Sequence, residues 1–534
     1  MSFAFSPDCW LSNNACQALR FRAWSRFKEA LKYPEEIQKR KLLGLVAVNA
    51  TTTFGREHGF SSIRTVEQYQ ERIPLRRYED FEPYLERIAL GESLVLTSSP
   101  VPTFLPSGGS SLGNKFIPST PDLRNEFQAG IAPWLYEMMN QRPGLKGGSA
   151  YWSISPAGAS QPVLKGVVPV GFEDDSHYLG TWERRFIART LAVPSEVSRV
   201  GDLDRFRYRT LLKLLGRKDL RLISVWNPSF LTLLLEPLTG WWDRVLSDLR
   251  RGTEGSRPDP IRATELSKVG PRDFKNFWPE LRLISCWTDG PAAGFVPALR
   301  ELFPEVEIES KGLLATEAIV SIPFGSLRPL ALLSHFFEFM DRRGNVSLAQ
   351  DLKEGGDYSV VVSTGGGFYR YLLQDRVRVE GFVGKTPAIS FLGKEDRFSD
   401  LCGEKLEEGF VAAAMGRVFK ALNLNPAFSL LAPERTGLKR RYLIFLEMEA
   451  LGTAEVAGKV EEELRAQFHY DYCRRLGQLA PVEFRLLAPG ASTLYLQARY
   501  RKGQRLGDIK PTALEINQEL IETLMALAVK RGAA

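Results

Sequence analysis

The chain has 534 residues, of which 44% are hydrophobic, so it is long enough for a large core and for several domains of roughly 150 residues. Its net charge of +7 comes from 70 basic and 63 acidic residues spread along the whole chain, a balance too mild to indicate nucleic-acid binding. Five widely separated cysteines support neither a disulfide framework nor a zinc site, and no apolar run is long enough for a membrane span, so we expect a cytoplasmic enzyme. We also expect it to be a monomer.

The N-terminal part shows helical periodicity. Trp24, Phe27 and Leu31 recur at the spacing of one helix face, and a second amphipathic run follows over 37–46, after a proline. We expect two helices whose apolar faces dock on a larger body.

A stretch rich in glycine and hydroxyl side chains follows an expected strand. Adenylate formation needs such a loop, because glycines let backbone N–H groups approach a triphosphate while hydroxyls and a lysine offset its charge. A flexible surface turn is an equally good interpretation of this stretch alone, and the spacing is not that of a P-loop ATPase. The stretch reads Ser107, Gly108, Gly109, Ser110, Ser111, Leu112, Gly113, Asn114, Lys115.

Two apolar segments, 220–226 and 281–287, have nearly the same sequence and are interpreted as strands. Two ordinary core strands can match by chance, so the similarity itself carries little weight. Strands separated by helical segments favour a parallel sheet, whose ligands gather beyond the carboxyl ends of the strands. The loops at 227–229 and 288–290 are therefore expected to face a cleft.

The segment 312–317 ends an apolar run with a hydroxyl and a carboxylate, Thr316 and Glu317. Thr316 is suited to hold an α-phosphate and Glu317 a magnesium ion, which prefers oxygen ligands and phosphate bridging. A helix N-cap with a glutamate in the first turn is the alternative, and from this segment alone it is the stronger one.

Alternating residues over 357–382, interrupted by three glycines at 365–367, predict an antiparallel hairpin. Asp375 follows a strand of this hairpin, where its carboxylate could accept hydrogen bonds from two ribose hydroxyls. A simple turn residue is the alternative. Downstream we expect a strand at 387–391, a helix over 406–422 and strands at 442–448 and 494–498.

Together these segments resemble the auxin-responsive acyl acid-amido synthetase family (Gretchen Hagen three). This family is a branch of the adenylate-forming enzyme superfamily, which includes acyl-CoA synthetases and luciferases. The resemblance extends over nearly the whole chain, in the family's order and spacing. Its further matching segments are 53–60, 74–80, 91–92, 115–120, 368–382 and 403–406.

The resemblance implies an α/β fold with two domains. Residues 1–384 would form a large adenylate-forming domain with mixed sheets and helices that binds ATP and the acyl group, and residues 385–534 a smaller, mobile α+β domain. In the superfamily the small domain rotates between two half-reactions, so Gly384 is expected to lie in the hinge.

The resemblance also implies the chemistry. A carboxylic acid, ATP and Mg²⁺ would give an acyl-adenylate and pyrophosphate, and an amine or amino acid would then give an amide and AMP without a covalent enzyme intermediate. Two alternatives stay open: a ligase that makes a thioester or a free acyl-adenylate, and a nucleotide-binding homologue that has lost adenylation.

By family position, Glu317 would be catalytic and bind the metal, and Lys510 would be the catalytic lysine of the mobile domain. Phe127, Trp134 and Trp226 are expected to line the acyl pocket. The expected nucleotide contacts are Ser107, Gly108, Gly109, Ser110, Ser111, Thr316 and Asp375.

Several positions depart from the family pattern. Gly109 stands where a threonine is usual, and Leu313 replaces an aromatic residue that would contribute base stacking of roughly 1–3 kcal/mol. Leu112 and Gln374 replace glycines, and Leu372 replaces an arginine. These changes predict altered nucleotide contacts.

Overall fold

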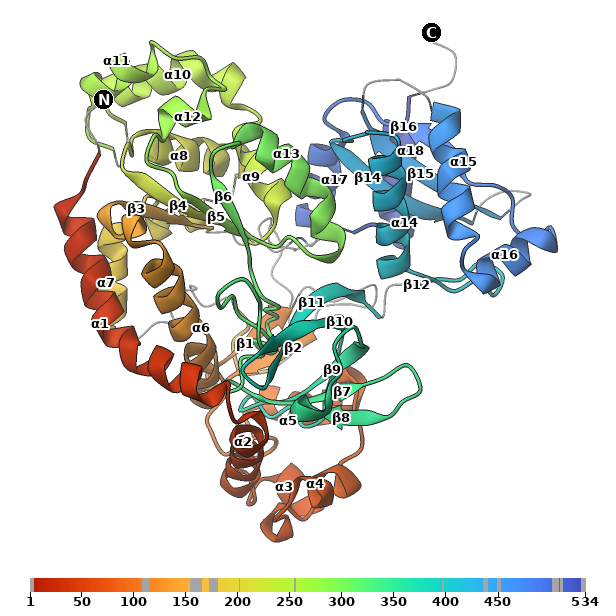
Figure 1. The fold of residues 1–534 in the computed structure, drawn as a ribbon. Coiled ribbons are helices and arrows are strands. Elements are labelled where there is room, and N and C mark those ends of the chain that lie inside the picture. Colours follow the sequence, from red (N-terminus) through yellow and green to blue (C-terminus); the bar gives the residue numbers. More distant parts are fainter. Residues whose placement is uncertain are drawn as a thin grey trace.

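The computed structural model describes residues 4–107, 115–153, 166–171, 181–200, 202–253, 256–395, 398–435, 440–448, 453–501, 509 and 512–529. It is a mixed α/β protein, which confirms the fold class expected from the sequence. Figure 1 shows a parallel sheet with helices, an antiparallel sheet below it and a C-terminal part to one side. Within the described residues, no helix combines the length and apolar character that a membrane span requires.

The two expected N-terminal helices are α1 (Pro7–Ala30) and α2 (Pro34–Val48). Ser6 begins α1, because its side chain accepts the N–H of Cys9 at 3.3 Å and Pro7 occupies the first helical position. α1 packs along α6 (Pro121–Gln141) and α7 (Thr181–Thr190), as Figure 1 shows. Three short helices follow α2: α3 (Thr53–Glu57), α4 (Val66–Arg72) and α5 (Glu82–Ala89).

The parallel sheet has four strands in the order β3 (Ser149–Trp152), β4 (Leu220–Ser224), β5 (Leu283–Cys286) and β6 (Glu307–Ser310). The predicted strands at 220–226 and 281–287 are β4 and β5, and they pair in parallel. Both are buried along their whole length, as strands covered on two faces are.

The helices of this part are mostly connections between the strands. Asn227 begins α9, because its side chain accepts the N–H of Ser229 at 3.0 Å ahead of a proline at the first helical position. The helices are α8 (Leu203–Leu215), α9 (Pro228–Leu235), α10 (Leu238–Arg251), α11 (Pro260–Leu266), α12 (Phe274–Phe277) and α13 (Val296–Leu302).

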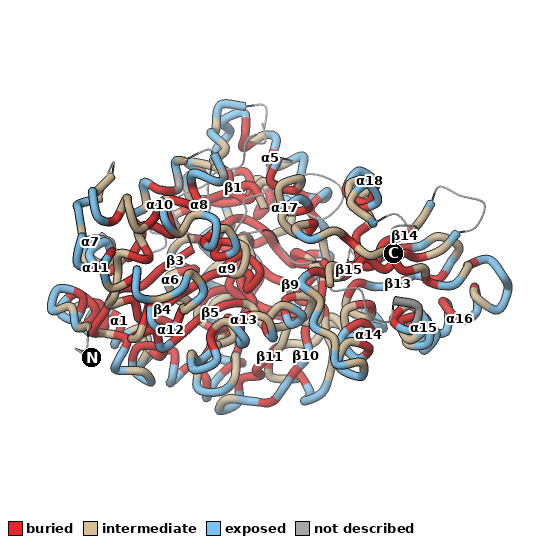
Figure 2. The backbone as a smooth tube through the Cα atoms, turned by 90° about the horizontal axis from the view of Figure 1, so that it is seen from above, coloured by how far each residue is buried: buried red, intermediate tan, exposed pale blue. Residues whose placement is uncertain are grey.

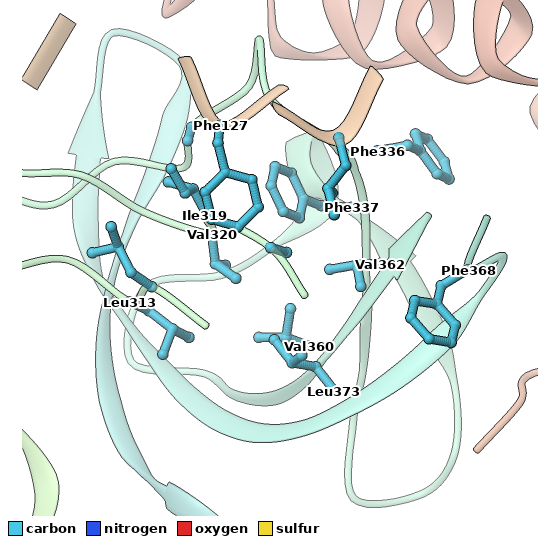
Figure 3. Close-up of a cluster of buried hydrophobic side chains, with 14 of the residues drawn as sticks. Phe127, Leu313, Ile319, Val320, Phe336, Phe337, Val360, Val362, Phe368 and Leu373 are labelled. Atoms are coloured by element: carbon cyan, nitrogen blue, oxygen red, sulfur yellow. The ribbon is translucent and has the colours of Figure 1, made fainter. Parts of the chain in front are cut away.

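The antiparallel sheet has the order β11-β10-β9-β7-β8, and the predicted hairpin forms its centre. Its buried face packs on α6 and the segment 313–320, and Figure 3 shows the resulting core between Phe127, Ile319 and Phe337. The strands are β7 (Phe336–Met340), β8 (Val346–Leu348), β9 (Asp357–Ser363), β10 (Tyr371–Val383) and β11 (Thr386–Lys394). A separate ribbon joins β1 (Thr103–Ser107) to β2 (Lys115–Ser119).

The expected domain boundary after Gly384 falls inside a strand pair of this sheet. β11 continues from β10 through a tight turn, with Phe382 opposite Pro387. Gly384 has a positive φ of 64° and packs on helix α1, where the N–H of Lys385 donates to the carbonyl oxygen of Leu31 at 2.9 Å. Gly384 is therefore a turn residue, and we propose that the boundary lies after Lys394 instead.

The C-terminal part contains a three-stranded sheet in which β14 (Phe428–Glu434) pairs antiparallel and β16 (Glu483–Leu486) parallel with the central β15 (Arg441–Glu447). The helix expected over 406–422 is α14 (Glu408–Ala421). The remaining elements are β12 (Phe398–Ser399), β13 (Leu406–Glu407), α15 (Thr453–Leu464), α16 (Phe468–Arg475), α17 (Ala491–Arg501) and α18 (Gln518–Leu527).

The strand predicted at 494–498 is wrong, because these residues lie inside α17. Four positions of α17 are buried, and three of them, Ala491, Tyr495 and Arg499, are spaced by four and lie on one helix face.

Among the described residues, the C-terminal part contacts the rest of the molecule in several places, of which two are apolar. α14 packs against β11 and the 3-10 turn Gly290–Phe295. Farther along the chain, Tyr500 and Ile509 join the core that β4 and β5 form with their helices. Figure 2 shows buried backbone along the strands of both parts and exposed backbone at the outer helices.

Candidate active site

Two of the motifs found in the sequence meet at the end of the β1–β2 ribbon. Ser107 and Lys115 are opposite each other in the strand register and mark the two ends of the glycine-rich loop. The Ser107 hydroxyl donates a long hydrogen bond of 3.5 Å to Oε1 of Glu317. The loop itself, with Gly108, Gly109, Ser110 and Ser111, lies outside the described residues.

Glu317 is buried in a tight turn and does not begin a helix, so the N-cap alternative does not apply. The N–H of Ala315 donates to the carbonyl oxygen of Ala318 at 2.9 Å, and Leu314 forms a bridge with Ile319. Thr316 is half-buried beside Glu317 in the same turn. The turn thus brings the hydroxyl and the carboxylate to the base of the glycine-rich loop.

Lys115 joins the first motif to the hairpin. Its Nζ donates to the Tyr371 hydroxyl at 3.3 Å and to Oε1 of Gln374 at 3.4 Å. Burial raises the pKa of the Tyr371 phenol well above its usual value, and the nearby carboxylates of Glu317 and Asp375 raise it further. Two acids and one lysine therefore surround a neutral phenol at the meeting point of all three motifs.

Asp375 owes its position to an irregularity in β10. Leu372 pairs with Val361 and Arg376 with Ser359, so β10 has two extra residues between these pairs. A bulge of this kind re-aims side chains. Asp375 is completely buried.

The two carboxylate oxygens of Asp375 differ in their partners. Oδ1 pairs with Nζ of Lys394 at 2.7 Å, directly across the strand pair. Oδ2 has no hydrogen-bond partner within the part of the chain that the structure describes. A buried acceptor in this state is suited to a ligand that brings hydroxyl donors.

A small cleft of about 50 Å³, which opens to solvent, lies beside Lys394, the partner of Asp375. The predicted loop at 288–290 lines it, as expected, together with the segment before Glu317 and strand β11. Glu408 brings α14 of the C-terminal part to the same cleft. The lining residues are Trp287, Thr288, Asp289, Pro291, Ala292, Lys311, Gly312, Leu313, Leu314, Ser321, Ile389, Phe391, Lys394 and Glu408.

Asp289 is the one acidic lining residue of the loop after β5. Burial raises the pKa of its carboxyl, and the Arg328 guanidinium at 3.3 Å opposes this shift. Its Oδ2 also accepts the backbone N–H of Phe391 at 3.3 Å, which ties this loop to β11.

Two of the three expected acyl-pocket residues surround a buried lysine. Nζ of Lys311 lies 4.1 Å from the ring centroid of Trp226 and 5.7 Å from that of Trp134. Phe127 lies elsewhere: its ring packs edge-on against His335 in the hydrophobic core shown in Figure 3.

Lys510 lies outside the described residues, but its neighbour Ile509 is described. The carbonyl oxygen of Ile509 accepts a hydrogen bond of 2.9 Å from Nδ2 of Asn227, in the loop after β4. This contact is buried, and it fixes the end of the segment that precedes Lys510.

The sequence did not reveal Lys311 or Lys394. Lys311 follows directly after a strand of the parallel sheet, a position where ligand contacts are expected. Lys394 faces Asp375 only because β10 and β11 pair in one particular register. A strand register of this kind cannot be predicted from the residue pattern alone.

The sequence analysis also did not predict a cluster of Cys402, Glu404 and Cys473. The sulfur and carboxylate oxygen atoms of these residues lie within 4.8 Å of one another. The Glu404 carboxylate already accepts the N–H groups of Leu401 and Cys402 at 2.7 and 2.8 Å, together with the hydroxyl of Tyr442. Burial raises the pKa of the Cys402 thiol. The cluster thus fixes the loop before β13 by hydrogen bonds.

Models of the GH3 family match the chain in three consecutive parts: the GH3 family N-terminal domain over residues 23–308, the central domain over 329–394 and the C-terminal domain over 410–519. The central match ends at the last residue of β11.

Curated relatives include a probable indole-3-acetic acid-amido synthetase GH3.1 from Oryza sativa subsp. japonica, which is 25% identical over 90% of this chain and 88% of its own length. The indole-3-acetic acid-amido synthetase GH3.4 from Arabidopsis thaliana is 22% identical over 93% of this chain and 91% of its own length.

Among solved structures, a GH3.15 acyl acid amido synthetase superposes with a TM-score of 0.83 at 20% identity, covering 95% of this chain and 96% of that one. A 2-hydroxyisobutyryl-CoA ligase in the postadenylation state superposes with a TM-score of 0.50 at 12% identity, covering 94% and 91%. These superpositions show a shared fold.

Proposed function

The chain belongs to the GH3 family, as its sequence motifs indicated, and from this membership we propose that it is an ATP-dependent acid–amine ligase. It activates a carboxylic acid as the acyl-adenylate, releases pyrophosphate, and passes the acyl group to an amine or amino acid with release of AMP. The names of its relatives, amido synthetases from two plants, support this enzyme class. The proposal includes a monomer that works in the cytoplasm.

The observation that carries the proposal is the meeting of three separate motifs around Lys115. Ser107 contacts Glu317, and Lys115 contacts Tyr371 and Gln374 next to Asp375. These residues are spread over more than half of the chain, yet they surround one site. A nucleotide needs just these partners: hydroxyls and a cation for phosphates, and a carboxylate for ribose.

The described residues fit ATP and Mg²⁺. The unpartnered Oδ2 of buried Asp375 suits a ribose hydroxyl, and Ser107 and Lys115 frame the loop that would hold the phosphates. Glu317 and the phosphate oxygens would hold Mg²⁺, a hard cation that prefers oxygen ligands and lowers the charge repulsion between an acid and a polyphosphate.

Leu313 lines the cleft where the family has an aromatic residue, and two aromatic side chains line the same cleft. Trp287 and Phe391 belong to the loop after β5 and to β11. We assign base stacking to these side chains, so the exchange at Leu313 need not abolish nucleotide binding.

In the first half-reaction a carboxylate oxygen of the acid attacks the α-phosphorus and pyrophosphate leaves. Attack by an anion on an anion requires nearby cations, and Lys115 supplies one in the described part of the site. In this proposal Lys510 supplies another during adenylation only. In the second half-reaction the amine nitrogen attacks the acyl carbon, and AMP and a proton leave.

The acyl group would lie against Trp226 and Trp134, on either side of Lys311. An apolar pocket with a few polar groups is typical of a small-molecule site. Trp226 belongs to the loop after β4 and precedes Asn227, whose side chain contacts Ile509.

The direct test is acid-dependent exchange of labelled pyrophosphate into ATP, followed by mass spectrometry of products formed with pooled acids and amines. An amide supports the proposal, whereas a thioester or a free acyl-adenylate identifies one of the alternative ligases. No exchange with any acid or metal, combined with intact ATP binding, would identify a homologue that only binds nucleotide.

Glu317→Gln provides the first prediction. Loss of the metal-binding charge should remove several kcal/mol of transition-state stabilisation, so exchange should fall by on the order of 10²-fold or more. The melting temperature should stay close to that of the parent. Exchange at the parent rate would show that Glu317 does not bind the metal.

A further inference from the structure

One buried carboxylate away from the cleft contacts several separate segments of the chain. Glu126 lies in the second turn of α6 and is only 5% exposed. Its Oε1 pairs with Nζ of Lys41 at 2.8 Å. Its Oε2 accepts hydrogen bonds from Nδ1 of His335 at 2.9 Å and from the backbone N–H of Gly365 at 2.7 Å.

His335 relays this contact to the turn that carries Glu317. Its Nε2 accepts the backbone N–H of Ile319 at 3.1 Å, so its proton resides on Nδ1 and is donated to Glu126. The carbonyl oxygen of Ile319 in turn accepts the hydroxyl of Ser334 at 2.9 Å. Ile319 is therefore held on both sides, two residues beyond Glu317.

Gly365 connects Glu126 to the hairpin that contains Asp375. It lies between β9 and β10, and its carbonyl oxygen accepts the Thr120 hydroxyl at 2.9 Å. Thr120 is the N-cap of α6 and directly follows β2. The approach is so close that a Cβ atom on Gly365 would lie 2.8 Å from Cβ of Asp122.

We infer that Glu126 is a positioning residue that holds helix α6, the Glu317 turn and the Asp375 hairpin in register. It resides on the helix that follows the glycine-rich loop, it reaches the Glu317 turn through His335, and it reaches the Asp375 hairpin through Gly365. This inference rests on the proposed function for its catalytic consequence, but its structural content does not.

The charge of Glu126 is essential to this arrangement. Three donors converge on it: an ammonium, an imidazole N–H and a backbone N–H. In Glu126→Gln one acceptor oxygen becomes an NH₂ group, so at least one donor faces another donor. A tautomer change of His335 would relieve that conflict only by removing the acceptor of Ile319.

The test uses amide hydrogen exchange at Ile319 and Gly365 together with pyrophosphate exchange. In Glu126→Gln, both amides should exchange at least about tenfold faster, because their acceptors are weakened. The kcat/KM for ATP should fall roughly 10- to 100-fold, with a rise in KM, because misplaced binding groups are costly.

Glu137→Gln is the matched control. Glu137 lies on the same helix, is 9% exposed and accepts the indole N–H of Trp24 at 2.6 Å, far from the nucleotide motifs. Glu137→Gln should leave the exchange rates of the Ile319 and Gly365 amides and the KM for ATP unchanged. Equal effects of the two variants would mean general destabilisation of α6 and would overturn the inference.

Two variants of His335 separate the relay from simple packing. His335→Asn retains a donor to Glu126 but removes the acceptor of Ile319, so only the Ile319 amide should exchange faster. His335→Gln presents an acceptor at the Nε2 position and should restore its protection. If Ile319 is equally protected in both variants, the relay does not exist, whether or not Glu126→Gln folds. A parent without pyrophosphate exchange would refute the proposed function, while the amide data would still decide the inference.

Discussion

At the scale of single residues, substitutions of Asp375 and Lys394 show whether Asp375 binds the nucleotide or only forms an ion pair with Lys394. Asp375→Ala should weaken ATP binding roughly 10- to 100-fold, since each charge-assisted hydrogen bond contributes about 1.5–3 kcal/mol. Titration of ATP by calorimetry measures this change. An unchanged affinity would leave Asp375 with only its structural partner.

The same variant should also lower the melting temperature, because Lys394 loses the carboxylate that it contacts at 2.7 Å. The double variant with Lys394→Met separates the two effects. It should recover part of the lost stability but none of the lost ATP affinity.

His335 gives the protein a dependence of stability on pH. Burial lowers the pKa of its imidazole from the usual 6.5, and this effect outweighs the opposing Glu126 carboxylate; Lys41 lowers it further. The unfolded chain therefore takes up this proton at a higher pH than the folded chain does, so the folded state loses stability as the pH falls through about 6.5.

Denaturant unfolding at pH 7 and at pH 5 measures this loss. The difference between the two pH values should be smaller in His335→Gln, which has no proton to take up. An equal difference in the parent and the variant would assign the acid sensitivity to other groups.

At the scale of elements, the turn between β9 and β10 needs a glycine at position 365 because of a close contact, whereas Gly367 in the same turn has a positive φ of 96°. In Gly365→Ala the new Cβ would lie 2.8 Å from Asp122, so overpacking should cost about 1–3 kcal/mol of unfolding free energy. Gly416→Ala in α14 is the control, because open space surrounds that position and the helix should gain about 0.5–1 kcal/mol. Similar effects of the two substitutions would contradict the contact.

Elements with a strong local period were predictable from sequence, and elements defined by distant partners were not. The periodicity of Trp24, Phe27 and Leu31 predicted α1, and the alternation over 357–382 predicted the β9–β10 hairpin. The boundary expected after Gly384 differs from the one proposed after Lys394, because membership of β11 in the sheet depends on its pairing with β10. No local pattern encodes that pairing.

The candidate site divides in the same way. Ser107, Glu317 and Asp375 were proposed from their segments taken together and from the family resemblance, because each segment alone had a structural interpretation that was at least as good or remained open. Lys394 and Glu126 were not found, since each matters only through residues that are distant in sequence. A single sequence does not predict which of its remote segments are in contact.

At the scale of the whole molecule, the buried contact between Asn227 and Ile509 links the parallel sheet to the segment that leads to Lys510. Lys510→Ala should slow acid-dependent pyrophosphate exchange and spare amide formation from a supplied acyl-adenylate, because transfer does not need that lysine. Separate assays of the two half-reactions measure this. Equal loss of both would contradict the division of labour, and loss of neither would make Lys510 a surface residue.

The core around β4 and β5 includes Tyr500 and Ile509, which belong to the last tenth of the chain. During synthesis on a ribosome, the residues that begin this core emerge long before those that complete it. Until those last residues are made, the nascent parallel sheet exposes part of its apolar surface. Exposed apolar surface of this kind binds chaperones or aggregates. A stop codon shortly before residue 500 would remove more than a tail, because it would leave the core around β4 and β5 permanently unfinished.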